Sequence, residues 1–282
     1  MTTIIDGRKL SKEILEETKK GIAALPFKPV FCDILVGDNP VSLQYVNMKK
    51  RVSQNLGINF HEAFFPIGIT TENLIDEIKK INKIPNMCGV IVQLPLPETI
   101  NHDEVLNAVD SNLDVDCLSI TASEKFYSGD LFLGFPTALA CIFLLDYVVS
   151  DLKNKKIAVM GLGKLVGKPV SALLSLRGLN IEIIRSKTER KEEILKDADV
   201  VIAGMGKGKY IKGDMIKQGV VIIDAGTSES NSGIVGDVDL ESVNGVASFV
   251  SPVPGGVGPM TIAMLFRNVL KVAQTITFKK IE

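Results

Sequence analysis

The sequence contains no tryptophan, and aromatic residues make up only 6% of its 282 positions. It also has no long block of one charge, because 32 lysines and arginines are interspersed with 33 aspartates and glutamates, for a net charge of −1. Nucleic-acid sites need basic patches and aromatic stacking platforms, and anionic membranes attract basic segments. The composition therefore favours neither nucleic acid nor a membrane as a partner.

Cysteine is also sparse. The four cysteines stand singly, at Cys32, Cys88, Cys117 and Cys141, with no CxxC pair, so we expect neither a disulfide framework nor a metal site. No apolar stretch approaches the length that spans a bilayer, and the first ten residues carry early charges without the apolar core of a signal peptide. A reduced, cytoplasmic compartment is the expectation.

Apolar residues are abundant, at 46% of the chain, which is enough for an ample core. The first half predicts helices over 8–25, 42–56 and 70–83, strands over 30–36, 58–65 and 88–94, and then a loop over 101–134. The second half predicts a helix over 137–149, a run of strand, helix and three strands from Lys156, and a closing helix over 260–273 that docks on another element. Strands that alternate with helices and are apolar throughout are typical of parallel sheets covered on both faces. The sequence therefore predicts the α/β class, with a doubly wound nucleotide-binding domain in the second half.

A glycine-rich turn follows the first strand of the second half, within 157–169. Gly161 allows the tight turn, Gly163 lets a pyrophosphate approach the backbone, and Gly167 lets the helix pack closely on the strand. The spacing is GxGxxxG rather than the usual GxGxxG. Between a strand and a helix it favours a dinucleotide site over a turn of purely structural origin.

The next strand ends in Ile-Ile-Arg-Ser-Lys-Thr at 183–188, without a carboxylate at its tip. NAD sites usually place an acidic residue there, to bind the ribose hydroxyls. Arg185 and Ser186 suit a 2′-phosphate instead, so NADP is favoured as the cofactor over NAD. A solvated basic turn is the alternative interpretation.

Five polar residues of the first half form a candidate constellation. Tyr45 and Lys49 are four apart in a helical stretch, and therefore share one face. Gln93 ends a buried strand, where open α/β sheets bind ligands, and Asp114 and Asp116 follow in a loop. Taken singly, each also fits an ordinary helix surface or a turn cap.

The segment at 250–265, VSPVPGGVGPMTIAML, has three prolines and three glycines in its first ten residues, which exposes backbone to a flat or anionic ligand. This segment, the residues 35–49 and 89–97, and more weakly 236–239 resemble the bifunctional methylenetetrahydrofolate dehydrogenase/cyclohydrolase family of the FolD type. The resemblance implies two α/β domains flanking a cleft, the second a Rossmann-like doubly wound NADP-binding domain, and usually a homodimer. We assign residues 1–136 plus 260–282 to a folate-binding catalytic domain and 137–259 to the NADP-binding domain.

The resemblance also implies the chemistry: oxidation of 5,10-methylenetetrahydrofolate with NADP, then hydrolysis of the methenyl product to 10-formyltetrahydrofolate. Lys49 matches the family's catalytic lysine, Gln93 holds or polarises it, Tyr45 packs on the folate, and Asp116 accepts hydrogen bonds from the pterin amino edge. Two further substrate-binding residues and seven cofactor-binding residues are implied: Pro254 and Gly255 for the folate, and Gly161, Leu162, Gly163, Arg185, Ser186, Thr227 and Thr261 for NADP.

Several positions depart from the family's pattern. The Lys-Asp-Val-Asp-Gly segment is Leu-Asp-Val-Asp-Cys at 113–117 with Leu-Ser after it, and Phe-Pro-Thr-Ala stands at 135–138 instead of Pro-Cys-Thr-Pro. The cofactor loops carry Gly-Leu-Gly at 161–163 and Gly-Thr-Ser at 226–228. A relative with one activity, or a folate-binding relative without catalysis and with a degraded cofactor site, is therefore the alternative. Another two-domain NADP dehydrogenase, such as one like shikimate dehydrogenase, is a third.

Overall fold

The computed structural model describes residues 1–230 and 233–279 of the chain. The chain divides into two compact units: unit 1 comprises Met1–Lys12 and Thr137–Met264, and unit 2 comprises Glu13–Pro136 and Leu265–Glu282. These bounds differ from the predicted domain ranges at residues 1–12 and 260–264. The first segment belongs to unit 1 because its short strand β1 (Thr3–Ile4) pairs with β11 (Phe249–Val250). Residues 280–282 of the predicted range lie outside the described residues.

Unit 1 contains a six-stranded sheet in which every neighbouring pair of strands is parallel. Its order is β1, β11, β8 (Val221–Asp224), β7 (Val200–Ala203), β5 (Ile157–Met160) and β6 (Ile181–Ile184). From β5 the chain first adds β6 on one side and then crosses to β7 on the other. The carboxyl ends of β5 and β7 therefore form a topological switch point, the place where doubly wound sheets bind ligands.

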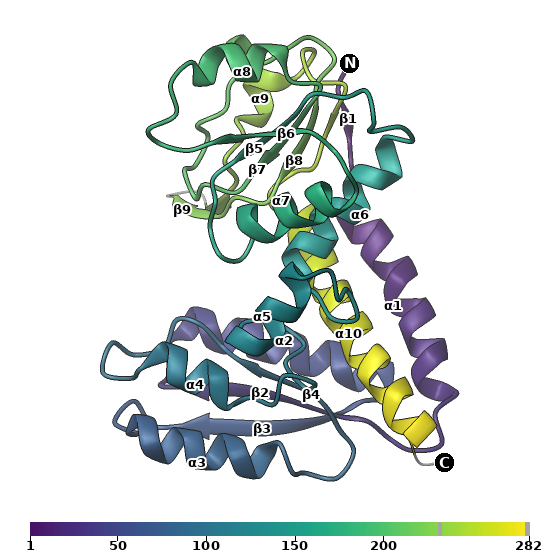
Figure 1. Cartoon of the computed structure of the whole chain (residues 1–282), viewed down its shortest axis with the longest axis vertical. Helices are drawn as coiled ribbons and strands as arrows, with labels where there is room; N and C mark the ends of the chain where they lie inside the picture. The colour runs from purple at the N-terminus through teal and green to yellow at the C-terminus, as the bar shows by residue number, and fades with distance from the viewer. Residues whose placement is uncertain (231–232, 280–282) are drawn as a thin grey trace. The chain divides into compact units, whose positions relative to one another are not determined.

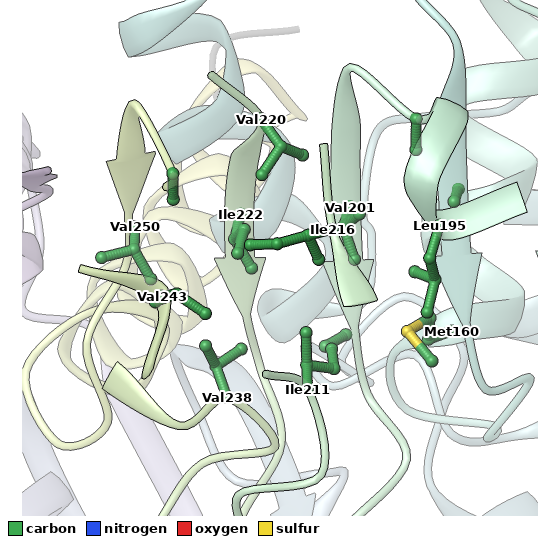
Figure 2. Packing of buried hydrophobic residues seen from close by; sticks show 14 of the residues in the cluster. Met160, Leu195, Val201, Ile211, Ile216, Val220, Ile222, Val238, Val243 and Val250 are labelled. Atoms are coloured by element: carbon green, nitrogen blue, oxygen red, sulfur yellow. The ribbon is translucent and has the colours of Figure 1, made fainter. Parts of the chain in front are cut away.

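Helices and an apolar core cover this sheet (Figure 1). The elements are α6 (Pro136–Val148), α7 (Gly167–Leu176), α8 (Lys191–Asp197), the 3-10 turn η1 (Gly213–Met215), the hairpin β9 (Ser228–Ser230) with β10 (Gly233–Val235), and α9 (Leu240–Val243). Figure 2 shows strand residues such as Val201 and Ile222 packed against Leu195, Ile216 and Val243 of the covering segments. Each such side chain contributes about 1.5–3 kcal/mol when it is fully buried.

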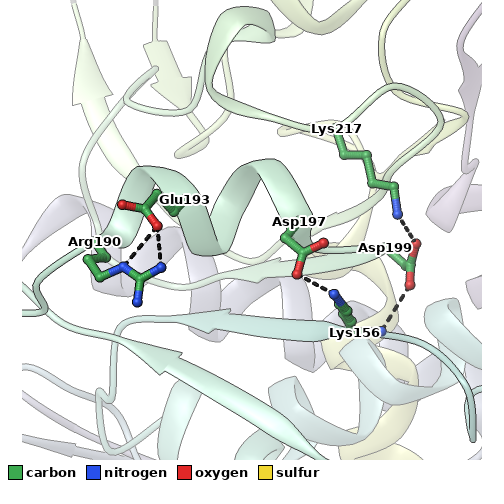
Figure 3. A network of polar contacts seen from close by, with 6 residues as sticks. All are labelled: Lys156, Arg190, Glu193, Asp197, Asp199 and Lys217. Carbon is green, nitrogen blue, oxygen red and sulfur yellow. Dashed lines mark hydrogen bonds and ion pairs between the residues drawn. The ribbon is translucent and has the colours of Figure 1, made fainter.

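Helix α8 was not predicted from the sequence, because its segment Lys-Glu-Glu-Ile-Leu-Lys-Asp is short and mostly charged. Leu195, which is fully buried, anchors it. Exposed ion pairs lie around it and along the amino-terminal edge of the sheet, where Lys156 contacts Asp197 and Lys217 Nζ lies 2.7 Å from Asp199 Oδ1 (Figure 3). This edge lies opposite the switch point, so these pairs belong to the scaffold rather than to a ligand site.

Unit 2 is built on a smaller parallel sheet, ordered β3 (Asn59–Phe65), β2 (Val30–Val36) and β4 (Met87–Val92). Its helices are α2 (Pro40–Leu56), α3 (Thr71–Ile81), α4 (His102–Ala108), α5 (Ile120–Tyr127) and most of α1 (Gly7–Ala23) and α10 (Val257–Lys279). Figure 1 shows α2 and α3 on opposite sides of this sheet. The alternation of side chains along β2 therefore gives Cys32 and Ile34 to the α3 face, and Asp33 to the α2 face.

Local sequence explains where α2 begins and ends. The side chain of Asn39 accepts hydrogen bonds from the backbone N–H groups of Val41 and Ser42, and Pro40 occupies the first turn. Gly57 ends the helix in a left-handed conformation with φ of 84°. The buried positions of this helix recur every three or four residues, at Ser42, Val46, Lys49, Ser53 and Leu56. A lysine therefore stands in the middle of the buried stripe.

The prediction of one loop over 101–134 is wrong, because α4 and α5 lie within it. Asn101 and Ser119 cap their N-termini, accepting hydrogen bonds from the backbone of Glu104 and Ala122. Both helices have only seven or eight residues, too few for a clear apolar period in the sequence.

The closing helix α10 packs in unit 2 through its second half. The ring of Phe266 lies edge-on to Phe31 of β2, with centroids 5.2 Å apart. Asn268 Nδ2 donates to the carbonyls of Val115 and Gly134, at 2.9 and 2.8 Å. The helix thereby fixes the segment that follows β4. None of the helices in the described part of the chain is both long and apolar enough to cross a membrane.

Candidate active site

Lys49 is the centre of the polar site in unit 2. Only 6% of the residue is exposed, yet its ammonium is held by two partners from the sheet. Lys49 Nζ lies 2.7 Å from Asp33 Oδ2 and donates a hydrogen bond of 2.8 Å to Gln93 Oε1. Three segments distant in the sequence therefore converge on one amine.

Asp33 is the site residue that the sequence analysis missed. It is fully buried in the central strand β2, and burial raises the pKa of its carboxyl while the neighbouring Lys49 opposes that shift. The signal was present in the sequence, because a carboxylate interrupts an otherwise apolar strand, Val-Phe-Cys-Asp-Ile-Leu-Val. Such a residue is costly to bury unless it has a partner.

Gln93 is held by hydrogen bonds from both its backbone and its side-chain amide. Its backbone N–H extends the sheet by donating to the Ile34 carbonyl at 2.8 Å, and its Nε2 donates to the Leu94 carbonyl at 2.6 Å. The amide oxygen thus faces Lys49 and cannot turn away without losing the second bond. The adjoining Leu94–Pro95 peptide bond is cis.

The loop that carries Asp114 and Asp116 runs beside β4, where Val90 donates to the Leu113 carbonyl at 2.8 Å. Asp114 is buried, and its Oδ2 accepts a 2.7 Å hydrogen bond from the backbone N–H of Ser119. Asp114 therefore organises the loop rather than facing a ligand. Cys117 has φ of 59°, so cysteine adopts here the left-handed conformation that suits the glycine expected from the family resemblance.

Asp116 belongs to the electrostatic surroundings of Lys49. Burial raises the pKa of Asp116 to about 6, the charge of Lys49 opposes the shift, and the carboxylates of Asp114 and Asp33 add to it. Tyr45 lies one turn before Lys49 on α2 and is 39% exposed. A tyrosine ring on the accessible side of a buried lysine can stack on a flat ligand.

The glycine turn of unit 1 lies at the switch point. Gly161 has φ of 90°, and a Cβ built on it would lie 2.6 Å from the Gly204 carbonyl oxygen in the turn after β7. A Cβ on Gly167 would lie 1.9 Å from the Gly161 carbonyl oxygen, whereas one on Gly163 would meet nothing within 4 Å. Gly161 and Gly167 are therefore required by packing, and Gly163 leaves open space.

The first turn of α7 has no side-chain cap, because the residue before it is Val166, whose side chain cannot accept a hydrogen bond. The Lys168 N–H donates to the Gly163 carbonyl at 3.1 Å and Pro169 has no N–H, so it is the positive end of the helix dipole that suits a phosphate. Arg185 and Ser186 are exposed after β6, and the Arg185 backbone N–H donates to Thr188 Oγ1 at 2.8 Å. Within the described residues no ion pair engages the Arg185 guanidinium. These features fit a dinucleotide with an additional phosphate.

Two buried aspartates, Asp224 and Asp237, hold the loops beside this turn, and Asp237 accepts hydrogen bonds from the backbone N–H groups of Met205 and Lys207. Asp224, at the end of β8, accepts hydrogen bonds from the backbone N–H groups of Gly226, Asp237 and Val238. Burial raises the pKa of its carboxyl to about 7, although these donors lower it. A Cβ on Gly236 would lie 2.0 Å from Asp224 Oδ2, which explains the glycine of the Gly-Asp-Val-Asp segment. The same network holds the turn that presents Thr227, which is exposed. Leu162, between the two turn glycines, is half-buried.

The proline-glycine segment has its own structural reasons for glycine. Gly255 has φ of 113°, and a Cβ on Gly256 would lie 2.7 Å from the Pro252 carbonyl oxygen. Pro254, after a cis peptide bond, is exposed. Thr261, on the first turns of α10, places its Oγ1 3.4 Å from Thr137 Oγ1. The glycines of this segment therefore reflect internal packing as well as exposed backbone.

No group of three or more histidine, cysteine, aspartate or glutamate side chains in residues 1–230 and 233–279 is arranged to hold a metal ion. A doubly wound sheet with a phosphate-type glycine turn and a separate α/β unit with a buried lysine define the class of two-unit NAD(P)-dependent dehydrogenases.

Comparison with known proteins narrows the class. The family model for the tetrahydrofolate dehydrogenase/cyclohydrolase catalytic domain matches residues 5–116, and that for the NAD(P)-binding domain of the same enzymes matches 136–277. The chain belongs to the tetrahydrofolate dehydrogenase/cyclohydrolase family. It is 41% identical to the bifunctional protein FolD of Nautilia profundicola over 96% of this chain and 97% of that protein.

Solved structures agree with this assignment. The crystal structure of the bifunctional FolD enzyme from Campylobacter jejuni superposes with a TM-score of 0.92 at 34% identity, covering 98% of this chain and 100% of that one. The FolD enzyme of Trypanosoma brucei, solved with NADP and an inhibitor, gives 0.91 at 28% identity, with 98% of each chain covered. The predicted α/β fold and family are confirmed.

Proposed function

We propose that this chain catalyses two successive reactions on one reduced folate. It is an NADP-dependent methylenetetrahydrofolate dehydrogenase, which forms 5,10-methenyltetrahydrofolate, and a methenyltetrahydrofolate cyclohydrolase, which forms 10-formyltetrahydrofolate. The observation that carries the proposal is the contact between Lys49 and Gln93, in the part of the chain that matches the family's catalytic domain. The alternative of a non-catalytic or monofunctional relative is not favoured, because relatives named as bifunctional match nearly the whole chain.

In the dehydrogenase step a bound NADP would supply the hydride acceptor for the methylene carbon. The residues of unit 1 bind and orient the cofactor. Gly161, Leu162 and Gly163 would hold the pyrophosphate, and Arg185 with Ser186 would bind the 2′-phosphate. Thr227 and Thr261 would make the remaining contacts with the cofactor. Because the two nitrogens beside the carbon stabilise the methenyl cation, this step depends on positioning more than on proton transfer.

In the hydrolytic step water attacks the methenyl carbon, and a proton must move close to that carbon. Lys49 supplies this proton transfer, because it is a buried amine in the unit that binds the folate. Gln93 positions it, since the amide is itself held through the Leu94 carbonyl. Both residues therefore act in the hydrolysis.

Four residues recognise the folate. Asp116 accepts hydrogen bonds from the pterin amino edge in its ionised form, and Tyr45 packs on the flat ring. Pro254 and Gly255 border the substrate, with a rigid backbone that carries little side-chain bulk.

We further propose that the protein works in the cytoplasm as a homodimer. All four cysteines are buried and none forms a disulfide among the described residues, which supports a reducing compartment, and the family resemblance supports the dimer. Light scattering on the purified protein tests the second statement, and a monomeric mass across micromolar concentrations would reject it.

Two separate substrates test the activities independently. With 5,10-methylenetetrahydrofolate, the protein should reduce NADP, and NAD much less efficiently. With 5,10-methenyltetrahydrofolate alone, it should accelerate hydrolysis above the buffer rate. Absence of either acceleration removes that half of the proposed function.

A further inference from the structure

Asp33 differs from the other buried aspartates in what its carboxylate does. Asp114, Asp224 and Asp237 each accept at least one backbone N–H and thereby hold a loop. Asp33 accepts none: apart from its ion pair with Lys49, neither oxygen has a hydrogen-bond partner among the described residues. A role in holding the backbone therefore does not explain this carboxylate.

The depth at which Asp33 is buried also sets its carboxylate apart, because burial makes a charge costly. Asp33 is 0% exposed in the central strand of its sheet, and an isolated buried charge there costs several kcal/mol. An apolar residue would suit the strand better, as it does at Phe31 and Leu35 on the same face. What the carboxylate supplies in return is an oxygen 2.7 Å from the amine of Lys49.

We propose that Asp33 is a positioning residue that holds Lys49 in place and stores its proton during the hydrolytic step. Asp33 is too deeply buried to touch the substrate and acts through Lys49 alone. The inference rests on the proposed cyclohydrolase function and adds to it a residue that the comparisons do not assign.

During hydrolysis, protons move between Asp33, Lys49 and the substrate. The Lys49 ammonium passes a proton to Asp33 Oδ2, and the amine so formed takes a proton from the water whose oxygen bonds to the methenyl carbon. The carbon–nitrogen bond of the ring then breaks, and the leaving nitrogen takes the proton from Lys49. The hydroxyl proton of the adduct leaves to solvent as the formyl group forms, and Asp33 returns its proton to Lys49. One proton is released, which matches the positive charge lost from the methenyl cation.

The surroundings of the pair support this exchange. Two titratable groups act electrostatically on the pair: the carboxylate of Asp116 on the loop beside β4, and the thiol of Cys32, which lies next to Asp33 in the strand but on its opposite face. Burial raises the pKa of the Cys32 thiol, so it stays neutral. Burial also raises the pKa of Asp33, which makes its protonated form accessible despite the adjacent ammonium.

Asp33→Asn tests the inference, because it keeps the side-chain shape and removes the proton acceptor. We expect hydrolysis at pH 7 to fall by at least about tenfold, with the KM for the folate changed less than about twofold. The loss should shrink as pH rises, because at high pH the unassisted Lys49 amine forms by losing its proton to solvent. The rate is measured from pH 5.5 to 9, and the rate without enzyme is subtracted at each pH.

A merely structural role predicts a different result, in which activity falls by the same factor at every pH. That result, or an unchanged rate, overturns the inference. Cys32→Ala, in the same strand but on its opposite face, is the matched control and should keep the wild-type pH profile. Dehydrogenase activity reports on folding, and Asp33→Val, which suits a buried strand, replaces the asparagine variant if that variant folds poorly.

The two proposals fail in different ways. If the wild-type protein does not hydrolyse methenyltetrahydrofolate, the proposed function fails. If the wild type is active and Asp33→Asn equals it at every pH, only the role of Asp33 fails.

Discussion

Gln93 Oε1 accepts a hydrogen bond from Lys49 Nζ across 2.8 Å, although 44 residues separate them in the sequence. The contact joins a helix that follows one strand of a parallel sheet to the residue that ends another. It forms because β2 and β4 are neighbours, so that the segments at their carboxyl ends meet. A buried amine held by two fixed partners is the feature on which the hydrolytic chemistry depends.

Lys49→Met should abolish most of the hydrolysis. We expect the cyclohydrolase rate to fall by about 100-fold or more, since general acid–base groups contribute about 10²–10⁴-fold. The dehydrogenase step should fall much less, because it requires no proton transfer. The absorbance of methenyltetrahydrofolate measures both steps. Unchanged hydrolysis would contradict the assigned role.

The neighbouring lysine provides the control for this substitution. Lys50 follows on the same helix and contacts Glu62 at the surface. Lys50→Met makes the same chemical change outside the buried stripe, and both activities should stay within about twofold of the wild type. Thermal unfolding of both variants separates lost chemistry from lost stability.

The affinity for folate should depend on pH through Asp116. Because its pKa is raised to about 6, the carboxylate is ionised above that pH and protonated below it. If only the ionised form binds the pterin edge, the KM for the folate rises about tenfold one pH unit below the pKa. Asp116→Asn should raise the KM and remove this dependence between pH 5 and 7. A wild-type KM that stays constant over this range would rule out the role.

Arg185 should set the preference for NADP. A hydrogen bond to a charged group contributes about 1.5–3 kcal/mol, so Arg185→Ala should raise the KM for NADP by about 10- to 100-fold. The KM for NAD, which lacks the 2′-phosphate, should change little. Arg177→Ala is the control, because the Arg177 guanidinium is already paired with Asp146 at 2.6 Å. Equal effects of Arg185→Ala on both cofactors would contradict phosphate recognition.

Gly163 should matter for the cofactor and not for folding. A Cβ at this position meets nothing within 4 Å, so Gly163→Ala should leave the melting temperature nearly unchanged. The added methyl group would occupy the space that the pyrophosphate requires, and the Kd for NADP, from titration calorimetry, should rise at least about tenfold. Gly68→Ala, another glycine in open space, is the control and should affect neither quantity. Unimpaired NADP binding by Gly163→Ala would place the pyrophosphate elsewhere.

The sequence predicted those parts of the fold where local pattern and tertiary structure agree. Apolar strands with glycines at their ends, such as β5 and β8, are visible because both faces of a parallel strand are buried. The helices α4, α5 and α8 escaped prediction because seven or eight residues hold too few buried positions to show a period. For α4 and α5 the caps, Asn101 and Ser119, were the available signal, whereas α8 has no side-chain cap.

The site residues that were predicted are likewise those whose position shows in the local sequence pattern. Lys49 and Gln93 lie where helix period and strand end place them, so their types and positions suggested a ligand site. The partnership of Lys49 with Asp33 was not predictable from spacing, because it depends on which face of β2 packs on α2. Gly255 was assigned to ligand contact, whereas its φ of 113° also requires a glycine there.

One time course tests the central claim most directly. The purified protein is mixed with 5,10-methylenetetrahydrofolate and NADP, and the absorbances of NADPH and of the methenyl product are followed together. The account predicts that NADPH accumulates while the methenyl absorbance rises briefly and then decays faster than in buffer. No reduction of NADP, or a methenyl product that decays only at the buffer rate, would contradict it.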